Sequence, residues 1–156
     1  MLGEADEVSL SESAFSEIND LSVRSNRPDR LITEALTSAI QFSPQLELHC
    51  LTTADLLRGT DLSKARIAFQ EAIEGCQWLV DTLVHVRGAA VNIGTPIERA
   101  ETWFLAEQTT AKAIKDVGEA FERDDQTLVA DLLEYELTAA LAMWNHAITG
   151  ELDRRR

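Results

Sequence analysis

The segment LITEALTSAIQFSPQLELHCLTTADLLRG, residues 31–59, decides the fold. Pro44 lies inside it, where a proline removes a backbone hydrogen bond and kinks a helix. Apolar and small side chains nevertheless keep one phase across Pro44, alternately four and three residues apart, which is typical of a long helix packed against other helices. They are Ile32, Leu36, Ala39, Ser43, Leu46, Cys50, Thr53 and Leu57. We therefore predict one kinked helix over residues 30–58.

Three further segments carry the same kind of stripe, and they predict helices over residues 61–87, 96–123 and 126–149. Thr60 or Asp61 begins the first of these helices, which Arg87-Gly88 closes before a loop, AAVNIG. Thr95-Pro96-Ile97-Glu98 has the pattern of a capping box and begins the next one. Asp124-Asp125 separates the last two, and Gly150 ends the last. Four amphipathic helices with short connections predict an all-α, antiparallel four-helix bundle over residues 30–150.

The two ends of the chain are expected to lie outside the bundle. Residues 1–29 are polar, but Ala14, Phe15, Ile18 and Leu21 recur at helical spacing. They predict a short N-terminal helical arm that docks on the bundle, since so short a helix is marginal by itself. The last six residues, ELDRRR at 151–156, are predicted to be a solvated tail.

The composition excludes several classes of function. The formal net charge of −13 opposes binding to nucleic acid and to anionic membranes. No apolar run approaches the roughly 20 residues that cross a bilayer. The acidic N-terminus lacks the apolar region of a signal peptide, so we expect a cytoplasmic protein.

No catalytic residue, metal ligand set or cofactor is predicted, so we expect no enzyme. His49, His85 and His146 are not spaced as in the Glu-x-x-His pairs of dimetal bundles. Glu107 and Glu136 lie on the inward rows of their helices. They either share a proton or a cation, or bond at the edge of the core to neighbouring side chains. The cysteines, Cys50 and Cys76, both lie on apolar faces, as small hydrophobic residues do.

The three tryptophans divide into two groups. Trp103 and Trp144 lie on inward rows and are predicted to be core residues. Trp78 lies opposite the apolar stripe of its helix, with Ile67 on the same side. It is an exposed residue, an anchor for another chain, or a residue covered by the arm through Phe15 and Ile18. The candidate partner-binding residues are therefore Trp78, Ile67, Phe15 and Ile18.

Three short stretches carry a family resemblance: Arg27-Pro28-Asp29-Arg30-Leu31, residues 59–65 (GTDLSKA), and the acidic break at residues 124–125 followed by a helix closing near Trp144. With these, the layout resembles the flagellin export chaperone family, whose members are acidic helical bundles. The resemblance implies a bundle that wraps an extended helical partner. The chain departs from the family in its N-terminal segment, which lacks tyrosines, and in Pro44.

These observations lead to a hypothesis and two alternatives. The hypothesis is a non-enzymatic binding module, a chaperone-like adaptor for an amphipathic helical segment of another protein. The first alternative is a homo-oligomeric structural bundle with subunit contacts at Leu105, Leu128 and Tyr135. The second is a carboxylate-based metal-binding bundle that uses Glu107 and Glu136.

Overall fold

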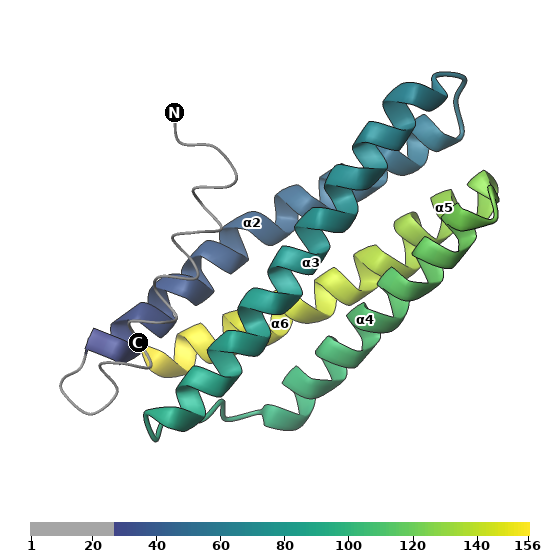
Figure 1. Cartoon of the computed structure of the whole chain (residues 1–156). Helices are drawn as coiled ribbons and strands as arrows, with labels where there is room; N and C mark the ends of the chain where they lie inside the picture. The colour runs from purple at the N-terminus through teal and green to yellow at the C-terminus, as the bar shows by residue number, and fades with distance from the viewer. Residues whose placement is uncertain (1–26) are drawn as a thin grey trace.

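Figure 1 shows the computed structural model of the chain, which describes residues 27–156. Within this range the chain forms four helical rods and no strand, so the predicted all-α four-helix bundle is confirmed. The first three rods are α2 (Arg27–Leu57), α3 (Leu62–Asn92) and α4 (Ala100–Glu122). The last rod is continuous and consists of α5 (Gln126–Asp131), the π-helical segment η1 (Leu132–Leu137) and α6 (Thr138–Arg155).

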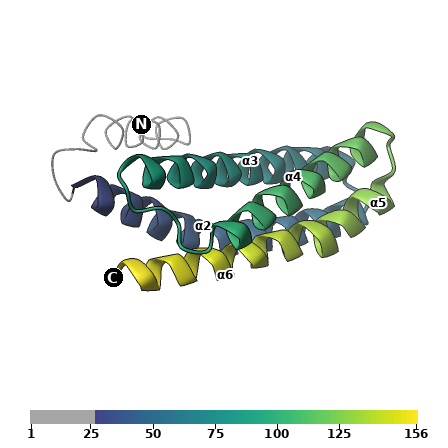
Figure 2. The same cartoon turned by 90° about the horizontal axis from the view of Figure 1, so that it is seen from below.

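Successive rods run in opposite directions and surround one core (Figures 1 and 2). α2 packs along α3 on one side and along the last rod on the other. α4 also packs along the last rod, whereas α3 and α4 approach each other at the fewest places of any neighbouring pair. In the view of Figure 1, α6 is visible between α3 and α4. The bundle is therefore closed at three of its interhelical seams and less closed at the fourth.

Both predicted core tryptophans are buried at the centre of the bundle, as expected. The rings of Trp103 and Trp144 meet edge to face with their centroids 5.1 Å apart. The Trp103 indole N–H donates a hydrogen bond to the carbonyl oxygen of Leu83, 3.3 Å away. Trp78 is only partly buried, in agreement with the prediction that it lies outside the core.

Two predicted helix starts are confirmed by their caps. The Asp61 carboxylate accepts a hydrogen bond from the backbone N–H of Lys64, and the Asp125 carboxylate accepts one from Leu128, each at 3.1 Å. Such bonds satisfy backbone donors that the first turn of a helix leaves free. Pro44 lies inside α2, which is one helix as predicted, because a phase-preserving apolar stripe outweighs the single lost backbone bond.

The predicted end of the second long helix is wrong. α3 continues past Arg87-Gly88 to Asn92, so most of the expected loop AAVNIG is helical. Ala89 and Ala90 are buried, and this packing outweighs the poor helix propensity of Gly88. The helix stops just before Gly94, whose φ of 79° lies in the left-handed region that favours glycine.

The predicted capping box at Thr95 is also wrong, since α4 begins only at Ala100. The backbone groups that were expected to begin this helix form hydrogen bonds with residues at the end of α6 instead. The Thr95 and Pro96 carbonyl oxygens accept hydrogen bonds from Arg155 and Arg154 respectively. The Glu98 N–H donates to a Glu151 carboxylate oxygen, 3.3 Å away. Long-range bonding therefore delays the helix by one turn.

The predicted solvated tail is wrong as well. α6 runs through Gly150 to Arg155, and Glu151 and Leu152 are buried. The helix continues because the side chains of its last turns have partners on other elements. The boundary between bundle and tail at residue 150 therefore does not exist. At the other end, α2 begins at Arg27, three residues before the predicted start.

The π-helical segment η1 has no counterpart in the sequence-based prediction. It lies in the last rod, where the guanidinium of Arg58 pairs with the carboxylates of Asp131 and Glu134. The Thr138 hydroxyl donates a hydrogen bond to the Glu134 carbonyl oxygen. The apolar spacing of Leu133 and Leu137 fits either kind of helix, so the wider turn left no trace in the pattern.

Candidate functional site

Of the four predicted partner-binding residues, the structure describes Trp78 and Ile67. Trp78 meets the Phe42 ring of α2 edge to face, with centroids 5.1 Å apart, so α2 covers part of it. Ile67 is exposed, but it lies eleven residues before Trp78 on α3, about 16 Å along the helix axis. Phe15 and Ile18 lie outside the described residues. Trp78 and Ile67 are therefore separate features of α3.

The two carboxylates once considered for a shared proton or cation do not face each other. Glu107 is bound by Arg87 of α3 through two hydrogen bonds of 2.6 and 3.0 Å. Glu136 is exposed, and its charge lies close enough to Lys112 to raise the pKa of that amine. The larger cause of this rise is the hydrogen bond from Lys112 to Asp116. Within residues 27–156, no group of three or more acidic, histidine or cysteine side chains could hold a metal ion.

Two of the three histidines contact backbone carbonyl oxygens through their rings. The His49 ring lies 3.0 Å from the carbonyl oxygen of Ala68, across the α2–α3 seam. The His85 ring lies 2.6 Å from the carbonyl oxygen of Asp81, one turn earlier on α3. These contacts anchor the rings to the helices.

The cysteines are buried thiols on neighbouring helices. Cys50 of α2 and Cys76 of α3 are both fully buried in the core. A hydrogen bond to Cys50 and burial away from water together raise the pKa of the Cys76 thiol far above its usual value. Both cysteines therefore lie in the core, where the sequence analysis placed them as small hydrophobic residues.

A cluster of ion pairs closes the end of the bundle where α2 begins and α6 ends. The Arg155 guanidinium is almost fully buried and lies 2.6 Å from Glu151 and 2.7 Å from Asp29. Arg154 also donates hydrogen bonds to the Glu151 carboxylate, and these raise the pKa of Arg154. A charge pair this deeply buried requires good geometry, and here it ties three segments together.

A cleft of about 300 Å³ lies beside this cluster, between the α3–α4 connection and the end of α6. Its walls include Trp103, His146, Glu98 and Glu151. Both of these glutamates already pair with Arg154. These two acidic side chains of the cleft therefore take part in holding the end of the bundle together.

The α3 side of the less closed seam carries a second apolar row, beside the row that faces the core. Arg87 pairs with Glu107 of α4, and Phe69 stacks on Phe121 of α4 with ring centroids 4.2 Å apart. These two contacts show which side of α3 faces α4. Next to this side of α3, rotated toward solvent, is a row of half-buried or exposed aliphatic side chains. They are Ile73, Val80, Val84 and Val91.

The α4 side carries a matching double row. Glu107, Ile114 and Phe121 are seven residues apart and face α3. A second row lies closer to solvent, and each of its members comes three residues before a member of the first row. That row consists of Phe104, Ala111 and Gly118. Phe104 is 51% exposed, and Val91 on the facing helix is 59% exposed.

We call this surface the α3–α4 seam. It comprises the four aliphatic residues of α3 just named, together with Phe104, Ala111, Ile114, Gly118 and Phe121 of α4. Ile114 and Phe121 are partly buried and also pack against the core. Its apolar positions on each helix are three, four or seven residues apart, which is the spacing with which one helix packs against another.

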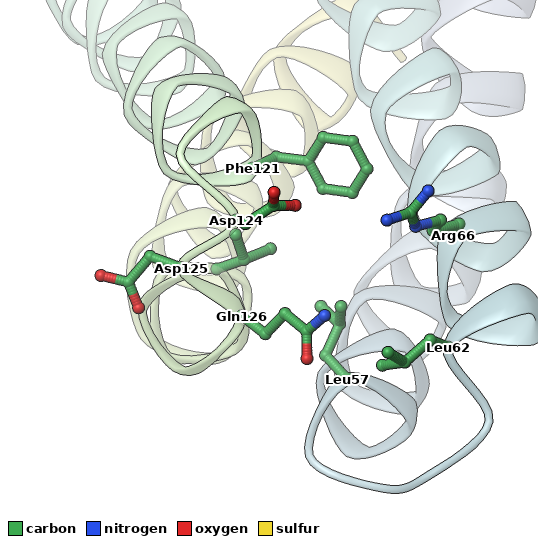
Figure 3. Close-up of a pocket in the computed structure, with 8 residues that line it drawn as sticks. Leu57, Leu62, Arg66, Phe121, Asp124, Asp125 and Gln126 are labelled. Atoms are coloured by element: carbon green, nitrogen blue, oxygen red, sulfur yellow. The ribbon is translucent and has the colours of Figure 1, made fainter.

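A small pocket marks one end of the seam (Figure 3). The Phe121 ring points from α4 toward α3, where Arg66 lies opposite, and Leu57 and Leu62 line the lower wall. Asp124 and Asp125, in the turn after α4, add acidic side chains at this end. The end of the seam is therefore apolar in its depth and charged at its rim.

Sequence reasoning missed the seam, although a signal for it was present. Phe104, Ala111 and Gly118 recur at intervals of seven, as do Val84 and Val91. One apolar stripe on each helix is enough to predict a four-helix bundle, so the second stripe played no part in the prediction. Trp78 attracted the partner prediction because it was the largest apolar residue off the first stripe.

Among residues 27–156, no helix is long and apolar enough to cross a lipid bilayer.

Comparison with known proteins assigns the chain to a family. Neither the curated proteins nor the solved structures contain a match to the chain. One family model matches residues 34–147, a range that includes most of α2, all of α3 and α4, and much of the last rod. The chain therefore belongs to the family described as a domain of unknown function (DUF8042).

Proposed function

We propose that this protein is a non-enzymatic binding module that receives an amphipathic helix of another protein in the α3–α4 seam. One observation carries the proposal. The pair of neighbouring helices that packs least is also the pair in which both helices present a second apolar row. A four-helix bundle closed on itself needs only one such row on each helix.

The physical reason is the apolar area that a fifth helix would cover. Removal of apolar surface from water stabilises a complex by roughly 25 cal/mol per Å². A half-exposed Phe or Val still has apolar surface that a partner could cover. Knobs from an added helix fit the holes between residues spaced three and four apart on α3 and α4. Helix-in-groove binding of this kind uses anchors at the same spacing in the partner.

The resemblance to flagellin export chaperones implies the same kind of partner, an extended helical segment. Chaperone-like activity and a cytoplasmic location both stay predictions. The carboxylate-based metal site is not proposed further, because Arg87 occupies Glu107 and Glu136 lies elsewhere.

Site-specific photocrosslinking in the native cell tests the proposal. A photoreactive phenylalanine at position 104 should crosslink to another protein, at a segment that forms an amphipathic helix. The matched control is position 48 on α2, where Leu48 is 65% exposed and lies outside the seam. Crosslinking at 48 but not at 104 would contradict the proposal.

The homo-oligomeric bundle remains the second candidate. Tyr135 and Leu105 are exposed, as that hypothesis requires, whereas Leu128 is partly buried. In the same experiment, a photoreactive residue at position 135 that captures a second copy of this chain would favour it. Capture of another protein at 104 and of nothing at 135 would favour the binding module.

A further inference from the structure

The partner helix can be described more closely from the length of the seam and the charges beside it. This inference rests on the proposed function and adds the chemistry of the partner. Along α3 the apolar row runs from Ile73 to Val91, which corresponds to about 27 Å of helix. Along α4 it runs from Phe104 to Phe121, about 26 Å. An occupant that covers the seam is therefore a helix of about 18 residues or more.

A polar contact crosses the seam about one turn from its Val91–Phe104 end and restricts what lies above it. Arg87 pairs with Glu107 there, with the guanidinium partly exposed and the carboxylate side chain only 11% exposed. A large apolar knob at this level would desolvate the pair, and such burial is expensive. The occupant therefore needs a small or polar residue opposite Arg87, with apolar residues on either side. This contact sets the register of the bound helix, as polar core positions do in coiled coils.

The charges that flank the seam are mainly acidic. On the outer sides of α3 and α4 they are Asp81, Glu101, Glu119 and Glu122, against Arg66 and Lys115. At the pocket end, Asp124 and Asp125 add to the acidic side (Figure 3). Within the described residues, the carboxylates of Asp81, Glu101 and Glu122 form no ion pair. They remain available to a cationic partner.

We infer that the seam binds a basic amphipathic helix, with one apolar heptad stripe flanked by lysine or arginine. Charge complementarity favours this partner over an acidic helix, since like charges across an interface are repelled. The chain's net charge of −13 acts in the same direction by steering cationic segments toward the protein. A second copy of this chain, which carries the same negative charge, would be repelled.

The test uses the full chain and three synthetic helical peptides of about 20 residues. Two share one apolar heptad stripe, and their flanks carry either lysine and arginine or glutamate. The third has the basic composition with its stripe scrambled. Fluorescence anisotropy of labelled peptides should show the basic striped peptide binding at least about tenfold more tightly than the other two. Raising the salt concentration should narrow this difference.

Each other outcome has a separate meaning. Equal binding of the basic and acidic striped peptides would overturn the inference and leave the proposed function standing. Equal binding of the basic striped and scrambled peptides would show electrostatic attraction alone and overturn the inference. Binding of neither striped peptide would count against the proposed function itself.

Two pairs of variants place the binding on the seam. Phe104→Glu should lower the affinity for the basic striped peptide by about tenfold, and Leu48→Glu, at an exposed position outside the seam, should leave it unchanged. The double variant Glu101→Lys with Glu122→Lys should reverse the preference toward the acidic striped peptide. All substituted side chains are exposed, and circular dichroism verifies that each variant is folded. An unchanged preference in the double variant would overturn the inference.

Discussion

α3 has two neighbours, and its two seams are built differently. Toward α2, Gly75 leaves room for Phe42 and Leu46, and the Phe42 ring reaches Trp78. Toward α4, Arg87–Glu107 and Phe69–Phe121 hold the helices at two levels, and the aliphatic residues beside them stay partly uncovered. Close packing therefore depends on the size of residues at the contact, and apolar spacing alone does not produce it.

The difference between the two seams explains why Trp78 is only partly exposed. Its large ring lies off the main stripe of α3, but a neighbouring helix comes close enough to cover part of it. Val91 and Phe104 are smaller signals in the sequence, yet both are more than half exposed. Exposure of an apolar residue depends on its neighbours in space, which a single helical projection does not contain.

The largest expected effect separates the closed core from the seam. Trp144→Ala should lower the free energy of unfolding by about 3–5 kcal/mol, because the ring is fully buried against Trp103. Phe104→Ala, at the half-exposed seam position, should change it by less than about 1 kcal/mol. Urea denaturation followed by circular dichroism measures both. Similar losses in the two variants would mean that the seam is packed as tightly as the core.

A pair of glycine substitutions tests the two seams directly. A Cβ at Gly75 would lie 2.8 Å from the Leu46 Cδ1 and 3.4 Å from the Phe42 ring, whereas a Cβ at Gly118 would meet nothing within 4 Å. Gly75→Ala should destabilise the protein by about 1 kcal/mol, since overpacking exceeds the gain in helix propensity. Gly118→Ala should stabilise it by about 0.5–1 kcal/mol.

Thermal or urea unfolding of both glycine variants, compared with the parent protein, gives the sign of each change. The difference between them matters more than either value, because both substitutions make the same gain in helix propensity. If Gly75→Ala were as stabilising as Gly118→Ala, then α2 and α3 would be farther apart than the structure shows.

The last expected effect, similar in size to those of the glycine substitutions, concerns the exclusion of water from the α2–α3 side of the core. Contact with Cys50 and burial raise the pKa of the Cys76 thiol in the folded protein, whereas the unfolded thiol titrates near 9.0. When the pKa of a thiol is higher in the folded state than in the unfolded state, the folded protein keeps its full stability below the unfolded-state pKa. It loses stability as the pH rises above the unfolded-state pKa, because only the unfolded chain can ionise there. Between about pH 8 and about pH 10, the parent protein should therefore lose about 1 kcal/mol more stability than Cys76→Ala does.

Urea denaturation at the two pH values measures this loss, and the comparison with Cys76→Ala removes the contributions of other groups. Equal losses in the parent and the variant would mean that Cys76 ionises as readily in the folded protein as in the unfolded chain. Water would then reach the α2–α3 side of the core, and the contrast between the two seams would weaken.

The sequence by itself determined the number of long helices and the face that each one buries. Unbroken three-four spacing identified α2 despite Pro44, and the inward rows correctly placed Trp103 and Trp144 in the core. Asp61 and Asp125 were recognisable as caps. These features are readable because they depend on residues within a few positions of each other, where helix geometry relates sequence directly to space.

Only the tertiary structure decided where three of the helix ends lie and which apolar rows are covered. α3 ends at Asn92, α4 begins at Ala100 and α6 extends to Arg155, because buried alanines and bonds between distant segments outweigh local signals. Arg87 became the partner of Glu107 through contact across the seam, twenty residues away in the chain. The distance between two helices is set by all the residues between them, and so the exposed α3–α4 seam could be recognised only once the helices were packed.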